Sequence, residues 1–249
     1  MQDPAWYILL LIGTFLAAGL VKGVTGMGLP TVAMGVLGTV MPPAGAAALL
    51  VIPSFVTNVW QLFSGLSIAP LLRRLWPMMV CIFLGTIAGS AMLVMVDPLW
   101  SGLGLGVALT VYGAYALIAP AFSVPKRHEK WLSPLIGLIT GIATGATGVF
   151  VIPAVPYLGS LNMNREELVQ ALGLSFTCST IALAVGLFTH GAFRVEQAGA
   201  SMLAIVPALI GMWAGQRLRV LISPKRFRQC FLLFLIVLGL ELSSRPFLG

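Results

Sequence analysis

Charged residues are scarce in this chain. They make up 8% of its 249 residues, whereas hydrophobic residues make up 59%. An ordinary soluble domain has about 25% charged residues, so the composition excludes that class of protein. The gaps between the apolar runs are too short to hold an extramembrane domain, and any binding chemistry must therefore lie among the apolar segments.

Enzyme signatures are also absent. The sequence has no H-E-x-x-H, no G-x-S-x-G and no pair of carboxylates away from the ends of an apolar segment. Its three cysteines, Cys81, Cys178 and Cys230, fall in three different apolar segments, which argues against a disulfide framework and against a metal site. We expect no enzyme activity, no cofactor and no metal.

The apolar runs have the length of membrane helices. Most reach the roughly 20 residues that cross a hydrocarbon core of about 30 Å. We therefore expect an all-α, polytopic membrane protein, placed as a multi-pass protein in a bacterial inner membrane. The runs cover residues 5–41, 43–63, 75–96, 98–119, 131–160, 164–189, 196–221 and 227–242.

The formal net charge of +7 does not indicate a nucleic-acid partner. The basic residues lie in short loops beside the apolar runs, which is the pattern that orients membrane proteins. The expected partners are the lipid bilayer and a small anionic substrate, and the chain is compatible with a homo-oligomer.

One motif occurs twice. Residues 19–26 read GLVKGVTG and residues 141–148 read GIATGATG, each shortly before a proline, Pro30 or Pro153. Glycine and proline at such a position interrupt a membrane helix. Interrupted helices in corresponding positions of two halves are a pointer to a transport site.

Further matches extend the duplication along the chain. Ser54-Phe55 corresponds to Ser175-Phe176, and LGTIAGSAMLVMVDP at 84–98 matches IGMWAGQRLRVLISP at 210–224. We predict two homologous repeats of about four helices, residues 1–119 and 131–249, joined by a cytoplasmic linker at 120–130. The first helix of each repeat is expected to be broken.

The charges bear on how the repeats are oriented. If the first segment of each repeat crosses once, the Lys and Arg residues other than Lys22 divide 7 to 6 between the two sides, which gives no orientation. If each first segment is a hairpin, they divide 11 to 2, with only Arg194 and Arg245 on the minority side. The second scheme obeys the positive-inside rule. It predicts inverted repeats with both termini outside.

The two interruptions are the first candidate site. Irregular backbone at membrane depth is tolerated only where it faces protein or a watery cavity, and the helix that begins after each break points backbone N–H groups at an anion. Lys22 is a lone basic residue deep in an apolar segment, where a charge is costly and indicates function. Glycines four residues apart also serve helix packing, and a shallow hairpin would let Lys22 reach an interface. The candidate residues are Lys22, Gly23, Thr25, Gly26, Gly28, Thr144, Gly145, Thr147 and Gly148.

Polar residues on two later segments form a second candidate group. Ser54, Asn58 and Gln61 recur at helical spacing, and Ser175 and Thr177 lie in the matching stretch, where they are expected to line a polar cavity or to bond between helices. His190 follows at the end of the same segment, either as an interfacial histidine or as a titratable group of the site.

These glycine-rich segments carry a resemblance. GLVKGVTGMGLPTVAMGVLG and GLITGIATGATGVFVIPAVPYLGSLNM, followed by ALGLSFTCST, resemble the sulfite exporter TauE/SafE family of bacterial membrane permeases over nearly the whole chain. The resemblance implies two related halves, about eight spans and transport of sulfite, sulfonates or other small sulfur-containing anions. The family's frequent Gly-Gly-Gly run is replaced here by TGMGLP and TGVFVIP.

The functional expectation is transport of a small anion, in the direction of export. The acidic residues all map to loops or to the ends of the apolar segments, so none is available inside the membrane to couple protons. An anion leaving a cell that is negative inside gains about 2.3 kcal/mol per charge per 100 mV. The alternatives are an anion channel and a membrane-embedded assembly factor without transport.

Overall fold

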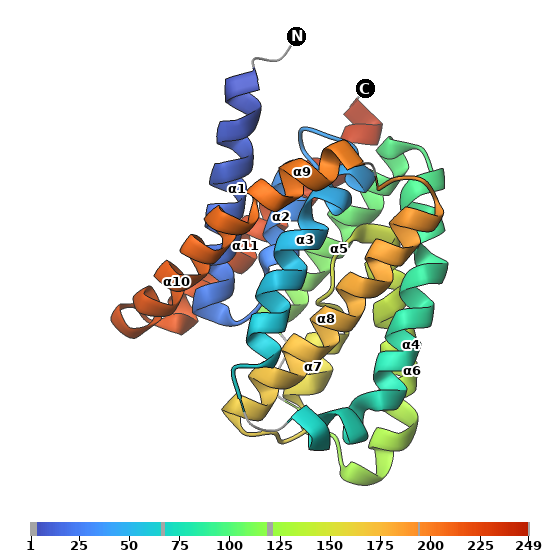
Figure 1. Ribbon diagram of the computed structural model, residues 1–249. Coiled ribbons are helices and arrows are strands. Elements are labelled where there is room, and N and C mark those ends of the chain that lie inside the picture. The colour runs from blue at the N-terminus through green and yellow to red at the C-terminus, as the bar shows by residue number, and fades with distance from the viewer. Residues whose placement is uncertain (1–3, 66–67, 119–121, 194, 249) are drawn as a thin grey trace.

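The apolar runs form a bundle of helices (Figure 1). The structure is a computed structural model that describes residues 4–65, 68–118, 122–193 and 195–248. Every regular element within these ranges is an α-helix. The helices are α1 (Pro4–Thr25), α2 (Leu29–Leu37), α3 (Pro43–Leu62), α4 (Ile68–Met95), α5 (Pro98–Ile118), α6 (Lys126–Thr147), α7 (Ala154–Gly159), α8 (Arg165–Thr189), α9 (Val195–Leu203), α10 (Ile205–Leu221) and α11 (Pro224–Leu248).

Seven candidate spans among the described residues are long and apolar enough to cross a membrane. α6 is not one of them, because four of its first five residues are charged and its apolar part is correspondingly shorter. The predicted all-α, multi-pass membrane fold is confirmed. α6 already begins at Lys126, so the last residues of the predicted linker are helical.

The first long helix of each half ends where the glycine motif predicts an interruption. α1 ends at Thr25, followed by Gly26 at φ 80° and Gly28 at φ 98°. α6 ends at Thr147, followed by Gly148 at φ 70°. Residues with a Cβ rarely adopt this left-handed conformation. Glycine at these positions therefore lets the chain leave the helix without steric strain.

Each interrupted helix packs against a helix of the other half. α1 lies along α10, where a Cβ at Gly23 would overlap the carbonyl oxygen of Met212, and α6 lies along α4, where a Cβ at Gly145 would overlap that of Thr86. At Gly85 on α4, a Cβ would lie 2.7 Å from the carbonyl oxygen of Leu138. These glycines allow backbones to approach as in small-xxx-small membrane interfaces.

The remaining long helices pair between the halves in antiparallel fashion. On α3 and α8, Gln61 lies near Gly173 and Asn58 near Thr180; α5 pairs with α11 in the same sense, with Gly106 beside Ser243. Equivalent helices of the two predicted repeats thus make equivalent contacts. That the halves are inverted repeats, divided at residues 119 and 131, stays a prediction.

The short helix α2 reverses the chain after the first break. At its start, Gly28 lies against Phe231 of α11, and beyond its end, Gly38 lies near Leu242. α2 therefore runs in the same direction as α11, back toward the end of the molecule where both termini lie (Figure 1). With 9 residues and about 1.5 Å per residue, it covers less than half of a hydrocarbon core.

The basic residues gather at the end of the bundle opposite the termini. α4, α6, α8 and α11 begin there and α10 ends there, and one ion pair joins the starts of α4 and α6, with Arg74 Nη2 2.7 Å from Glu129 Oε1. Arg245, near the end of α11, lies at the other end of the bundle. Arg194 lies outside the described residues.

This distribution leads to a prediction about sidedness. Because Lys and Arg face the cytoplasm, we expect the start of α6 and the start of α11 to be cytoplasmic and both termini to be outside. A variant without its native cysteines would carry one new cysteine at His128, at Arg226 or at the C-terminus. An impermeant maleimide added to intact cells should label only the C-terminal cysteine, and labelling of that cysteine only after lysis would contradict the inverted scheme.

Candidate functional site

The strongest candidate site is centred on a buried lysine. Lys22 lies in the last turn of α1, one turn before the break, and its side chain is 3% exposed. Its Nζ donates a hydrogen bond to Thr57 Oγ1 on α3 at 3.2 Å and a second, short one to Asn58 Oδ1. These bonds to α3 hold the amino group of Lys22 inside the bundle rather than at an interface.

Asn58 connects this lysine to the other half of the molecule. Its Nδ2 donates to Thr180 Oγ1 on α8 at 3.1 Å, and the Thr180 hydroxyl donates to the carbonyl of Phe176 at 2.7 Å. The Thr57 hydroxyl donates in turn to the Pro53 carbonyl at 2.8 Å. The side chains around Nζ are therefore oriented by helices of both halves and have little freedom to move.

No carboxylate neutralises Lys22 among the described residues. The two ion pairs that these residues form are Arg74 with Glu129 and Arg245 with Glu241, both toward the ends of the bundle. Lys22 contacts only neutral oxygens. In its protonated form this side chain is a buried charge without a counter-ion, which costs several kcal/mol.

The first break lies next to this lysine and is held by side chains. Gln61 Nε2 on α3 donates to the Gly26 carbonyl and to the Val169 carbonyl, each at 3.0 Å, and its buried Oε1 has no hydrogen-bond partner. The Thr25 hydroxyl accepts a bond from the Met27 N–H at 3.2 Å. A Cβ built at Gly26 would meet nothing within 4 Å, so the backbone there faces open space.

The second break is apolar and closely packed. The Thr147 hydroxyl accepts from the Val149 N–H at 3.2 Å, as Thr25 does at the first break, and Thr144 donates to the Val149 carbonyl at 3.3 Å. Gly148 lies against the side chain of Met34 on α2, and Phe150 is 1% exposed. The two motifs thus make similar local turns in different surroundings.

The remaining candidates lie at varied distances from Lys22. Gly23 and Gly145 face the neighbouring helices α10 and α4, as described above, and Gly28 lies against Phe231. Thr177 donates to the Gly173 carbonyl, and Ser175 is buried with no hydrogen-bond partner. His190 caps the end of α8, ten residues or about 15 Å beyond Thr180, and is not brought to Lys22.

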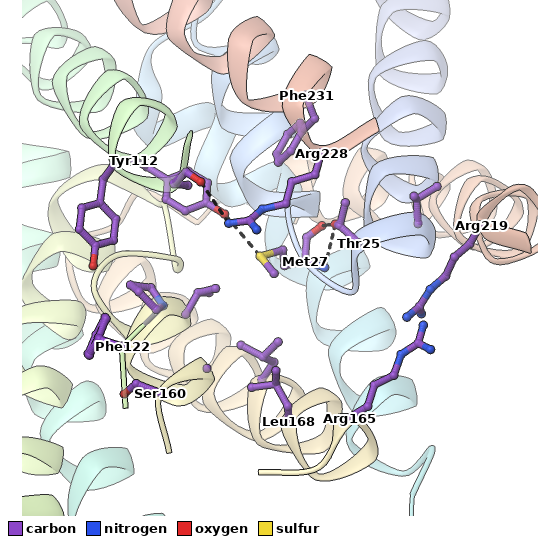
Figure 2. Close-up of a pocket in the computed structure, with 17 residues that line it drawn as sticks. Thr25, Met27, Tyr112, Phe122, Ser160, Arg165, Leu168, Arg219, Arg228 and Phe231 are labelled. Carbon is purple, nitrogen blue, oxygen red and sulfur yellow. Dashed lines mark hydrogen bonds between the residues drawn. The ribbon is translucent and has the colours of Figure 1, made fainter. Parts of the chain in front are cut away.

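A cavity of about 470 Å³ lies beside the first break (Figure 2). Thr25 and Met27 form part of its wall, and three arginines, Arg165, Arg219 and Arg228, also line it. The cavity lies at the basic end of the bundle. Sequence reasoning assigned these arginines only to membrane topology, and it passed over Thr57. Thr57 lies four residues before Gln61 and therefore on the same side of an isolated helix, so the helical spacing that marks Asn58 and Gln61 also includes it.

Comparison with known proteins identifies the family of the chain. A family model described as Sulfite exporter TauE/SafE matches residues 10–242. No curated protein and no solved structure matches the chain significantly. Because the family match covers both interrupted helices and nearly all of the bundle, the chain belongs to the sulfite exporter TauE/SafE family of membrane transporters.

Proposed function

We propose that the protein exports a small sulfur-containing anion, such as sulfite or a sulfonate, and that the anion binds at Lys22 beside the first break. Membership of the family supports membrane transport of sulfur anions. The observation that carries the site is the buried ammonium of Lys22, which has hydrogen bonds to Thr57 and Asn58 but no acidic partner among the described residues.

Neutral groups and the helix dipole compensate this charge only in part. Lys22 lies in the last turn of α1, where the partial negative charge of a helix C-terminus stabilises a cation by about 0.3–1 kcal/mol, rising to about 2 kcal/mol in favourable geometries. The desolvation penalty of a buried ion is several kcal/mol. An anionic substrate supplies the missing counter-charge, so the empty site is expected to be less stable than the loaded one.

The first break offers further groups to an anion. The backbone at Gly26 is open on its Cβ side, and the unpartnered Oε1 of Gln61 is able to accept a hydrogen bond from a protonated oxyanion such as hydrogen sulfite. Lys22 supplies charge, the break supplies space, and Gln61 holds the break in place through the Gly26 carbonyl.

Export is the direction that these features favour. Asp97, Glu129, Glu166, Glu167 and Glu241 lie at helix ends or in the terminal turns, so the described segments offer no carboxylate at mid-membrane for proton coupling. The interior-negative potential supplies about 2.3 kcal/mol per 100 mV for each charge that leaves. The cavity of about 470 Å³ lies at the basic, predicted cytoplasmic end, and a smaller one of about 280 Å³, lined by Thr39 and Arg245, lies at the other.

Flux in proteoliposomes tests this proposal. Vesicles loaded with radiolabelled sulfite and set to an interior-negative potential with valinomycin should release it through the protein, with a rate that saturates and that falls when the potential is reversed. Flux no greater than from protein-free vesicles would contradict transport of sulfite. A rate that rises linearly with concentration, together with single-channel currents in a planar bilayer, would identify a channel instead of a transporter.

A further inference from the structure

The cavity beside the first break is larger and more apolar than a bare oxyanion requires. Pockets of about 300–1,000 Å³ are typical of sites for organic ligands, and this one measures about 470 Å³. Much of its wall is apolar or aromatic. Leu172 of α8, Tyr112 of α5 and Phe231 of α11 line it and are otherwise almost fully buried, each less than 7% exposed.

Two arginines face each other across one side of this cavity. Arg165 is the first residue of α8, and Arg219 lies in the last turn of α10. Their side chains point toward one another in Figure 2. Neither forms an ion pair with the carboxylates that the structure describes. Arg165 is exposed and Arg219 half-buried, and two guanidinium groups that point toward each other repel, so an anion between them lowers the energy of this arrangement.

Two other arginines nearby have partners. Arg228 also lines the cavity but donates a hydrogen bond to the Ala116 carbonyl at 3.3 Å. Arg217, two residues before Arg219, lies over the ring of Trp213 at 5.5 Å. The positive-inside rule explains a basic end of the bundle, but it does not explain why two unpaired guanidinium groups share one cavity.

We propose that this cavity is a second anion site, separate from Lys22, that binds an organic anion. Its acidic head group lies between Arg165 and Arg219, where guanidinium groups bind oxyanions through paired charge-assisted hydrogen bonds. Its apolar body lies on Tyr112, Phe231 and Leu172. The inference rests on the proposed function only in treating this site as the place where an organic anion is captured before it reaches Lys22.

Binding to the purified protein tests separately what the charged head group and the apolar body of the ligand contribute to affinity. The probes are benzenesulfonate, which has head group and body, methanesulfonate, which has the head group with a single methyl, and benzenesulfonamide, which has the body without the charge. Titration calorimetry should give a dissociation constant for benzenesulfonate at least about tenfold below those of the other two, because only benzenesulfonate uses both the guanidinium groups and the apolar wall.

Variants assign the effect to the arginine pair. Arg165→Gln and Arg219→Gln should each weaken benzenesulfonate binding by about tenfold or more, Arg219→Lys by less, and Arg217→Gln should leave it within about twofold, although it removes the same charge from the same helix. The variants should unfold at the temperature of the parent protein. Lys22→Gln should retain benzenesulfonate binding, since the second site does not include it.

The outcomes distinguish this inference from the proposed function. Equal affinity for benzenesulfonate and methanesulfonate, or equal losses in Arg217→Gln and Arg219→Gln, would overturn the second site even if sulfite flux is normal. Loss of benzenesulfonate binding in Lys22→Gln would mean that the two sites are one. If only the Arg165 and Arg219 variants lose affinity for benzenesulfonate, and the parent protein moves no sulfite, the second site stands and the proposed transport of sulfite is refuted.

Discussion

Lys22→Gln is expected to raise the KM for sulfite efflux by about ten- to a hundredfold, with a smaller effect on the maximal rate. The change removes the ammonium that bonds Thr57 and Asn58 and keeps a side chain of similar length. A charge-assisted hydrogen bond in a desolvated site is worth about 1–3 kcal/mol, and each 1.4 kcal/mol is tenfold in affinity. The measurement is initial efflux rate against internal sulfite concentration in proteoliposomes.

The same variant is expected to be more stable than the parent protein when no anion is present. Burying a neutral amide costs less than burying an unpaired ammonium, so its unfolding temperature should be higher. Lys126→Gln, at an exposed position at the start of α6, removes the same charge and should change neither the KM nor the unfolding temperature. A KM in Lys22→Gln equal to that of Lys126→Gln would place the anion site elsewhere.

Valine at either break is expected to abolish transport. Gly26 and Gly148 have φ values of 80° and 70°, which a β-branched residue adopts only at considerable cost. At Gly26 the added side chain meets no neighbour within 4 Å, so the loss arises from the backbone and from filling the space in front of it; at Gly148 it also meets Met34. Efflux from proteoliposomes with matched amounts of folded protein measures the effect.

Gly191→Val is the matched control for this experiment. Gly191 follows α8 with a φ of 68° and also has open space at its Cβ position, so it carries similar strain at a turn outside the site. We expect Gly191→Val to lose stability to a similar degree and to keep transport. If Gly191→Val and Gly26→Val reduce flux equally, strain alone accounts for the loss and the break has no special role.

The sequence predicts the breaks because they depend on local chemistry. Glycine is the residue that takes a positive φ without strain, and glycines clustered with a threonine shortly before a proline favour a turn over a continuous helix. Thr25 and Thr147 make the same turn-closing bond to the second residue that follows. What differs between the breaks, a cavity at one and apolar packing at the other, depends on helices that are distant in sequence.

The residues around Lys22 could be predicted only in part. The helical spacing of Asn58 and Gln61 marked the correct face of α3. Ser54 has the same spacing, but its hydroxyl has no hydrogen-bond partner, whereas the Thr57 hydroxyl accepts a hydrogen bond from Lys22. Thr57 and Asn58 both accept hydrogen bonds from Lys22 Nζ. Thr57 belongs to the same helical face as Gln61, four residues later, but tertiary packing decides which members of that face meet Lys22.

The arginine pair could not be predicted at all from the sequence. Arg165 and Arg219 are 54 positions apart and each lies at the end of an apolar run, where a basic residue is expected for topology alone. Only the tertiary fold brings the start of α8 and the end of α10 to the wall of one cavity. The distribution of basic residues along the sequence therefore does not indicate that these two arginines line the same cavity.

Sulfite binding to the purified protein tests most directly whether the buried ammonium is the anion site. A ligand at 100 times its dissociation constant stabilises the folded state by about 2.7 kcal/mol. We predict that sulfite raises the thermal unfolding temperature of the parent protein in a saturable manner, that chloride at equal ionic strength does not, and that Lys22→Gln shows no such rise at the same sulfite concentrations. An equal, saturable rise in the parent protein and in Lys22→Gln would contradict an anion site at Lys22.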